Sequence, residues 1–577
     1  MLGTLWTVPI ILCLGSAGTD GETPPRDAAV AQARECLGKA LDAAQRLEDV
    51  AKKRRVLEDI GGDLADLGDF DAARRAIQVA DDPKATAMIL AAIGRTQAKR
   101  GDRDGATATL AEAMKRSDEV PTDGQRFVLY TILDGHLAAG QLAEAMRIAS
   151  RFRSQFDRSL AQMRVAEAHL AAGRRDVARE ILRQIPLPAP DTWRDFETSQ
   201  IVEQLGPLYL ALGDVDAALE IARAIPRGYW VRCRALCAVG TYQLKKGNAS
   251  TASAILQEAL EAARDTGPQG DGVSVHMAHE LEMERVVEAH VDGGDLDGAV
   301  RVLRQMSNGY QKVEAFRAIA TAQAKARNGA AARATLKQAV DMVVGLPDDD
   351  SAKVESLALL AMCQVEIGER VAARDTVAKA MLWLARRDSD LVLPAHSIAE
   401  VQVRLDDRLS AKKTLDDAAR QVLATSDAEF RMWDGSTMAK AQIDLGFNRE
   451  ALTTLRALVV PLAASTKKGE EEDDEKEEDP YCSRRGDVAV LLARAGDLAS
   501  GNRLAREIEG DLDFTVRQVA AQHVVANGPE EALALAEKET DPAMRCELYH
   551  GIAMGLLHLA KVETSTSWLI GSDWLMW

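Results

Sequence analysis

The sequence predicts an all-α solenoid, a stack of helical hairpins, and three observations lead to this. A turn residue followed five positions later by alanine recurs along the chain, most of the copies stand 33 to about 40 residues apart, and the flanking apolar positions keep the same register. At 577 residues the chain is also longer than one hydrophobic core can organise. We therefore expect one array of about thirteen helical hairpins.

The turns define each repeat. Three of them share the sequence Gly-Asp-x-Asp-x-Ala and begin at Gly68, Gly213 and Gly294. The other turn residues are Gly101, Gly140, Gly173, Gly247, Arg327, Gly368, Asp406, Gly446, Gly496 and Asn527. Glycine supplies the left-handed conformation that ends a helix, and aspartate directly after it suits the start of the next helix. The alanine lets the two helices of a hairpin approach closely.

Two apolar columns support this register. Eight residues before the turns, every position is aliphatic: Ile60, Ile93, Ile132, Val165, Leu205, Val239, Val286, Ile319, Leu360, Ile398, Met438, Val488 and Val519. The residue after each of these is usually glycine or alanine, and nine residues after the turns stand apolar residues such as Leu110, Leu256 and Leu336. Each hairpin therefore has an apolar flank that it buries only by stacking on its neighbours.

This pattern resembles the tetratricopeptide repeat (TPR) over about residues 54–546. Leu205-Gly206, Tyr209 and the turn at Gly213 match it best. The resemblance implies a right-handed α-α superhelical solenoid whose first helices line a concave surface, and a protein-interaction role. The chain departs from the family in its tyrosine column, four residues before the turn, which mostly holds Gln or His: Gln97, His136, His169, Gln243, His290, Gln323, Gln364, Gln402, Gln442 and His523. A position shared by Gln and His predicts a hydrogen-bonding side chain inside the stack.

The chain divides into six predicted segments. They are a signal peptide (1–18), an N-terminal capping helix (26–53), the main repeat array (54–465), an acidic disordered loop (466–481), the last repeats (482–546), and a C-terminal capping helix with a Trp-rich tail (542–577). The signal peptide is predicted from the apolar run 2–14 followed by small residues. We expect an exported protein, periplasmic, envelope-associated or secreted; without cleavage and export the chain would be cytoplasmic.

The composition excludes some classes of partner. A net charge of −18 provides no basic footprint for nucleic acid. The apolar run 2–14 is too short to cross a membrane as a helix, and no other segment is long and apolar enough. The seven cysteines form no CxxC pair, which argues against a zinc site or a disulfide framework.

Motifs of catalysis and cofactor binding are not found. The sequence contains no P-loop, HExxH, GxSxG or dinucleotide-binding fingerprint. His276 and His279 form a pair with metal-ligand spacing, but His290 belongs to the Gln/His column and no convincing third ligand remains. We therefore expect no enzyme, no cofactor and no metal.

The candidate binding surface is the groove lined by the first helices. In the resembled family, positions ten and six residues before each turn face it. The candidates are Tyr130, Asp134, Glu167, Glu284, Glu288, Arg317, His396 and Glu400. No repeat has the Lys and Asn pair that family members use to grip a peptide carboxylate, whereas the acidic members predict a protein or peptide partner with basic or polar segments.

Three alternatives remain at this stage. The groove can be an ordinary solvated helix face without a partner. The protein can be an enzyme with a site in the hollow of the solenoid. It can also be a structural repeat protein that assembles with copies of itself through its ends and the Trp-rich tail.

Overall fold

The computed structural model describes residues 25–187, 196–266, 275–307, 309–347, 352–386, 392–465, 482–508, 512–564 and 566. Within these residues the chain is built of helices and contains no β-strand, which confirms the predicted all-α class. The predicted signal peptide (1–18), the acidic loop (466–481) and the tail from residue 567 lie outside the described residues.

The chain forms two compact units. The central unit is Val50–Thr414, and the terminal unit combines Met1–Asp49 with Leu415–Trp577. Residues from both ends of the sequence therefore belong to the same unit.

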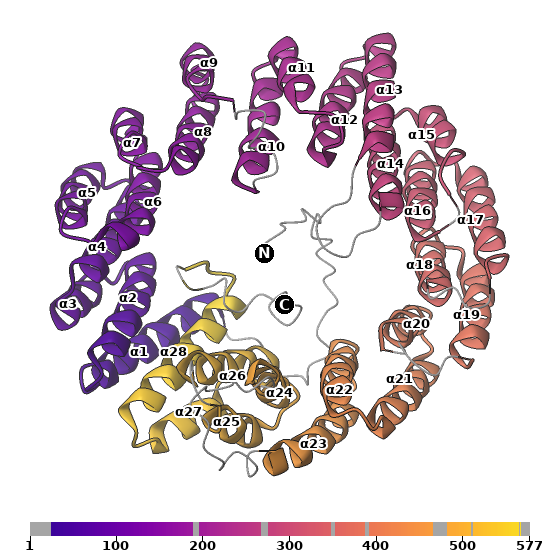
Figure 1. The fold of residues 1–577 in the computed structure, drawn as a ribbon. Coiled ribbons are helices and arrows are strands. Elements are labelled where there is room, and N and C mark those ends of the chain that lie inside the picture. The colour runs from indigo at the N-terminus through magenta and orange to yellow at the C-terminus, as the bar shows by residue number, and fades with distance from the viewer. Residues whose placement is uncertain are drawn as a thin grey trace, which may run out of the picture. The chain divides into compact units, whose positions relative to one another are not determined.

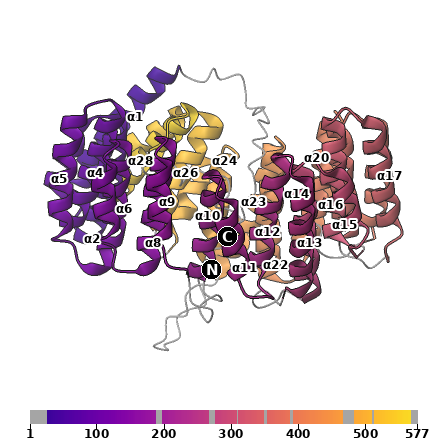
Figure 2. The ribbon, with the colours of Figure 1, turned by 90° about the horizontal axis from the view of Figure 1, so that it is seen from above.

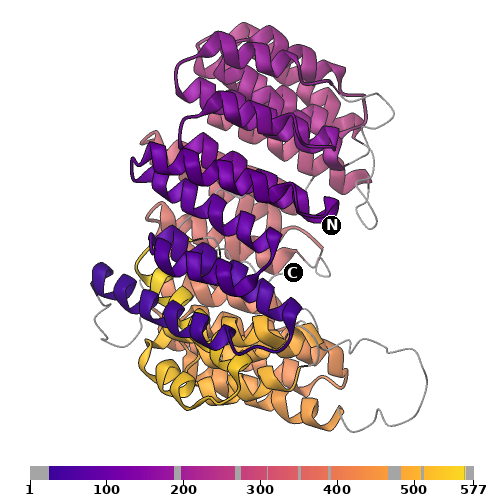
Figure 3. The ribbon, with the colours of Figure 1, turned by 90° about the vertical axis from the view of Figure 1, so that its left-hand side faces the viewer.

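The central unit is a succession of hairpins. Its helices are α2 (Val50–Leu67), α3 (Phe70–Ala80), α4 (Pro83–Lys99), α5 (Arg103–Ser117), α6 (Thr122–Ala138), α7 (Leu142–Ala149), α8 (Gln155–Ala171), α9 (Arg175–Arg183), α10 (Phe196–Ala211), α11 (Val215–Ala224), α12 (Trp230–Lys245), α13 (Ala249–Asp265), α14 (Val275–Asp292), α15 (Leu296–Leu303), α16 (Tyr310–Lys325), α17 (Gly329–Val344), α18 (Lys353–Glu366), α19 (Arg370–Leu384) and α20 (Val392–Arg404). First helices carry even numbers and lie along the inner side of the curve of this unit, with second helices outside (Figure 1). Successive hairpins stack in chain order (Figures 2 and 3).

The terminal unit continues the same pattern. After α21 (Arg408–Ala424), which crosses the boundary between the units, come α22 (Ala428–Asp444), α23 (Asn448–Ser465), α24 (Cys482–Arg494), α25 (Leu498–Arg506), α26 (Leu512–Asn527), α27 (Glu530–Lys538) and α28 (Pro542–Leu559). The first described helix, α1 (Arg26–Ala44), packs against α28 in this unit.

The predicted turns adopt one geometry. The ten turn glycines from Gly68 to Gly496 have φ between 70° and 104°, and Arg327 and Asp406 take the same left-handed conformation at 60° and 66°. The residue after the turn donates its N–H to the carbonyl five residues earlier, as Asp102 does to Gln97 at 3.0 Å. The same aspartate then caps the next helix, with Asp102 Oδ1 accepting from the Gly105 N–H at 2.9 Å. One residue thus closes one helix and starts the next.

The small and apolar columns pack together as the register predicts. The alanines five residues after the turns, such as Ala106 and Ala252, are fully buried. The aliphatic residues eight positions before the turns are buried as well. A methyl group added at Gly94 would stand 2.7 Å from Leu110 Cγ, and one at Gly240 would stand 2.5 Å from Leu256 Cδ2. The small residue of the first helix therefore makes room for the leucine of the second.

Most residues of the Gln/His column make a side-chain hydrogen bond inside the stack, as predicted. Gln323, Gln402 and Gln442 each accept through Oε1 from a threonine twelve residues later, at 2.8, 3.0 and 2.9 Å. His136 and His290 bond to the residue that follows the turn glycine, Gln141 or Asp295, at 2.6 and 2.9 Å. His523 bonds to the Ala493 carbonyl at 3.0 Å. Three members of the column are exceptions, because Gln97 Oε1, His169 Nδ1 and Gln364 Oε1 are buried without a hydrogen-bond partner among the described residues.

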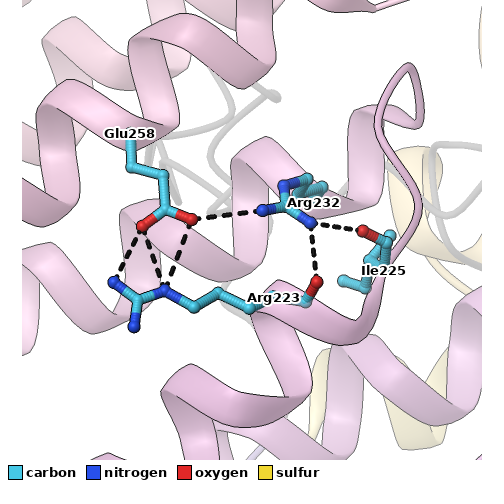
Figure 4. A network of polar contacts seen from close by, with 4 residues as sticks. All are labelled: Arg223, Ile225, Arg232 and Glu258. Atoms are coloured by element: carbon cyan, nitrogen blue, oxygen red, sulfur yellow. Dashed lines mark hydrogen bonds and ion pairs between the residues drawn. The ribbon is translucent and has the colours of Figure 1, made fainter.

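Hydrogen bonds and ion pairs of charged side chains join one hairpin to the next. Arg232 at the start of α12 donates to the Arg223 and Ile225 carbonyls at the end of α11, at 2.7 and 2.6 Å. Glu258 on α13 accepts from both Arg223 and Arg232 (Figure 4). The network satisfies the exposed carbonyls of α11 and sets its junction with α12.

Two details differ from the sequence prediction. The expected capping helix 26–53 ends at Ala44, and α2 begins at Val50, because the chain turns at residues 45–46. At the last predicted turn the left-handed residue is Gly528, with φ 89°, and not Asn527. Glycine adopts this conformation at little cost, so the turn moves by one residue to use it.

We predict that Thr454→Val lowers the free energy of unfolding by about 1–3 kcal/mol, because it leaves the buried Gln442 carbonyl oxygen without its donor. Urea denaturation followed by circular dichroism measures this. Thr453→Val is the matched control, since Thr453 is the exposed neighbour and bonds only within its own helix. Equal effects of the two variants would contradict a structural role of the column.

We also predict opposite effects of alanine at two glycines of the terminal unit. A Cβ at Gly551 would lie 2.2 Å from the Arg517 carbonyl oxygen on α26, which is backbone and cannot move aside cheaply. Gly551→Ala should therefore destabilise by about 1–3 kcal/mol. Gly38→Ala on α1 meets nothing within 4 Å and should be neutral or stabilising by up to about 1 kcal/mol. Thermal denaturation of both variants decides; a harmless Gly551→Ala would disprove the close approach of α28 to α26.

Candidate functional site: the inner face of the first helices

The inner face of the central unit consists of the first-helix side chains that do not pack into the hairpins. Because a helix repeats every 3.6 residues, this stripe contains the positions 13, 10, 6 and 2 residues before each turn. The predicted groove residues occupy two of these four positions.

Four carboxylates on this face are paired with a cation of the next first helix. The pairs are Glu58 with Lys84 Nζ (3.1 Å), Asp66 with Arg95 Nη2 (2.7 Å), Asp134 with Arg164, and Glu203 with Arg234 Nη1 (3.3 Å). We call this series the charge ladder. Half-buried pairs of this kind contribute modestly to stability, but they neutralise the face and bind successive hairpins to one another.

Tyr130 and Asp134 on α6 are likewise paired with side chains of α8. The Tyr130 hydroxyl donates to Asp157 Oδ1 at 3.0 Å, and Arg126 Nε lies 2.8 Å from the same oxygen. The pKa of Tyr130 is raised, first by burial and then by the Asp157 charge. Burial also raises the pKa of Asp134, and Arg164 opposes this shift. These side chains therefore already have partners within the array.

Glu284 and Glu288 on α14 are different. They make no hydrogen bond or ion pair within the part of the chain that the structure describes. On the next first helix, α16, Glu314 Oε2 accepts from Arg317 Nε at 2.7 Å. We call Glu284, Glu288 and Glu314 the acidic cluster. Burial, followed by the charges of Glu288 and Glu314, raises the pKa of Glu284 to about 8, and burial also raises the pKa of Glu288.

Two partly exposed apolar side chains lie on the same two helices as the acidic cluster. Met277 and Tyr310 both stand 17 residues before their turns, at the beginning of α14 and α16, and they are 50% and 38% exposed. The Tyr310 hydroxyl donates to Glu314 Oε1 at 3.1 Å, and burial raises its pKa to about 12. Exposed apolar surface beside unpaired charge is what a partner with both kinds of side chain would cover.

The remaining predicted residues lie elsewhere. Glu167 is exposed on α8, His396 is half-buried on α20, and Glu400 accepts from Arg404 of its own helix at 3.5 Å. The eight candidates therefore fall into three stretches of the array, on α6 and α8, on α14 and α16, and on α20. Of these, α14 and α16 bring Glu284, Glu288 and Arg317 together.

Sequence reasoning missed Glu314, Tyr310 and two cations of the charge ladder, Lys84 and Arg234. Their positions 13 and 17 residues before the turn lie on the same helical stripe as the positions that were considered. Extending the stripe by one and two helical turns would have found Glu314, Tyr310 and Arg234.

The described residues hold no group of three or more His, Cys, Asp or Glu side chains that could bind a metal ion. None of the described helices combines the length and apolar character that crossing a membrane requires. The chemistry that the acidic cluster offers is the binding of cationic groups by half-buried carboxylates.

Comparison with known proteins gives structural neighbours only. No protein-family model and no curated protein matches the chain. Among solved structures, Naa15/Naa10 bound to HypK-THB matches at 15% identity, covering 92% of this chain and 88% of that chain with a TM-score of 0.31. Ton1535 from Thermococcus onnurineus NA1 matches at 12% identity, covering 74% and 98%, with a TM-score of 0.22. The Cut9 chain of the APC/C Cut9–Hcn1 hetero-tetramer matches at 12% identity, covering 88% and 94%, also at 0.22.

At TM-scores this low the chains do not superpose as wholes. The TPR-like character of the hairpins rests on the geometry of this chain itself: the left-handed turn, the capping aspartate and the small-residue contact between the paired helices.

We predict that Glu284 makes the stability of the protein depend on pH. Its pKa of about 8 in the folded chain lies above the ordinary value of 4.5, so the folded state holds the proton more tightly. Its contribution is complete below the unfolded pKa and is lost as the pH rises towards about 8. The melting temperature should therefore fall between about pH 5 and pH 8 more steeply in the wild type than in Glu284→Gln. Parallel pH profiles would contradict this; Glu167→Gln, at an exposed glutamate on α8, is the control.

Proposed function

We propose that the protein is an interaction scaffold whose inner face, at the acidic cluster on α14 and α16, binds a basic segment of a partner protein. The observation that carries the proposal is the interruption of the charge ladder. Carboxylates on α2, α6 and α10 form ion pairs with cations of the next first helix, whereas Glu284 and Glu288 form none within the described residues, and the charges of Arg285 and Arg317 only partly oppose the burial that raises their pKa values.

Electrostatics supports a cationic ligand. A half-buried carboxylate with a raised pKa is incompletely compensated, and a Lys or Arg from a partner would form charge-assisted hydrogen bonds with it. Arg164 provides such compensation for Asp134 within the chain, so a partner's guanidinium at Glu284 or Glu288 would extend the charge ladder. Met277 and Tyr310 would contact the apolar side chains of the same segment.

A solenoid suits this role physically. Its first helices present side chains along an extended face, and the binding of a segment there requires no rearrangement of the hairpins. The TPR-like fold serves many partners, so the choice of partner depends on the side chains of the face.

Peptide binding tests the proposal in the full-length protein. Three peptides of equal length and apolar content carry Lys, Gln or Glu at the same positions, and fluorescence anisotropy measures their binding at low and high salt. We expect the Lys peptide to bind, Glu284→Gln/Glu288→Gln to weaken it about tenfold or more, and salt to weaken it further.

Matched variants separate a specific site from overall charge. Asp216→Asn/Asp297→Asn removes the same charge from exposed positions on the second helices α11 and α15. It should leave binding nearly unchanged. If both double variants weaken binding equally, the attraction is diffuse and the proposed site is wrong.

We also propose that the protein is exported, on the apolar run and small residues at its N-terminus. Determination of the N-terminal sequence of the protein purified from its own cells checks this. Cleavage near residue 18 would support export, and an intact Met1 with cytoplasmic fractionation would contradict it.

A further inference from the structure

The end of α28 has the geometry of a repeat turn. Lys561 takes the left-handed conformation with φ 54°, and the Val562 N–H donates to the Leu557 carbonyl at 2.9 Å. The same bond closes the first helix of the other hairpins, as with Asp214 and Tyr209. By this register α28 is the first helix of a further hairpin, yet no helix follows it among the described residues, which end at 566.

Helix α1 has the sequence of a second helix. Besides Ala29 and Ala43, its buried positions are Ala33, Cys36, Leu37, Ala40, Leu41 and Ala44. The second helix α13 buries Ala252, Ile255, Leu256, Ala259, Leu260 and Ala263, which have identical spacing. Alanine and then larger apolar residues in this order are what the second-helix side of a hairpin requires.

The two helices meet in the terminal unit. Helix α28 packs on α26 on one side and on α1 on another, and Figure 1 shows α1 beside α28. Tyr549 of α28 is buried, and Lys39 of α1 places its Nζ 5.4 Å from the ring centroid. Burial in this contact raises the pKa of the Cys36 thiol to about 12. A helix that is apolar on nearly all sides, as α28 is, needs covering on both flanks.

We propose that α28 presents a docking face for the second helix of a repeat, which α1 fills within one chain and which the α1 helix of a second copy fills when two chains exchange. The hairpin α28–α1 joins segments that are distant in sequence, so its partner helix is held without a connecting turn. An element of this kind can be traded between identical chains at low cost, because the contacts in the swapped and unswapped forms are the same.

Concentration decides between the two forms. Because α1 and α28 belong to one chain, a chain's own α1 meets α28 at an effective concentration that does not fall on dilution, so the monomer prevails in dilute solution. Exchange becomes visible where chains are concentrated, or where the α1 of one chain is displaced.

A peptide in trans tests the docking face. The probe is fluorescent peptide 26–44, and the receptor is the full-length chain carrying Ala40→Asp, which places a charge in the buried α1 contact. We expect the peptide to bind this chain about tenfold or more tightly than wild type, whose face is occupied. Ala31→Asp, at an exposed α1 position, should behave as wild type. Equal binding to all three chains, or no binding to a folded Ala40→Asp chain, would overturn the proposal.

Exchange is tested with a photo-crosslinking residue in place of Lys39, next to Tyr549. Light and heavy isotope-labelled full-length chains are mixed at high concentration, and the monomer and dimer fractions are crosslinked and analysed by mass spectrometry. We expect α1–α28 crosslinks joining light to heavy peptides in the dimer and not in the monomer. Crosslinks within one label only, or the absence of a dimer at every concentration, would refute exchange.

Discussion

The structure depends on one type of turn, which recurs in every hairpin and in which a residue in the left-handed conformation lies between the two helices. Its conformation lets the following N–H reach the carbonyl five residues back, and it places an aspartate to cap the next helix. Once the two helices diverge at this fixed geometry, their facing sides are determined. Gly94 against Leu110 and Gly240 against Leu256 then follow as the small and large members of one packed contact.

Besides this packing, ion pairs between successive first helices shape the inner face. Because equivalent helices stack in register, a carboxylate on one first helix can come within reach of a cation on the next, as Asp66 and Arg95 or Glu203 and Arg234 do in the charge ladder. At α14, Glu284 and Glu288 form no ion pair within the described residues, and burial raises their pKa values although Arg285 and Arg317 partly oppose this. The candidate interaction site thus lacks the ion pairs that the carboxylates of α2, α6 and α10 form.

The same register explains the position of α1. A repeat is specified by spacing within each helix, and nothing in that spacing requires the two helices of a hairpin to be consecutive in sequence. Helix α1 has the buried pattern of α13, and α28 ends in the repeat turn, so they pair although most of the chain separates them. Loop closure over such a separation costs entropy, which the burial of apolar surface on α28 offsets.

The sequence by itself determined the helices, the turns and the buried columns, because these depend on residues within one repeat: the glycine at 213, the aspartate after it and Leu205 before it are local signals. It also indicated that the Gln/His column bonds inside the stack, which Gln442 and Thr454 confirm. The tertiary structure decided what depends on neighbouring repeats and on the two ends. Asp134 and Glu284 look alike in sequence, but within the described residues Asp134 forms an ion pair with Arg164 of the next first helix and Glu284 forms none, since the stacking of hairpins determines which side chains meet. The partner of α1 was likewise undetermined, because a spacing pattern describes the face of a helix and not the distant segment that covers it.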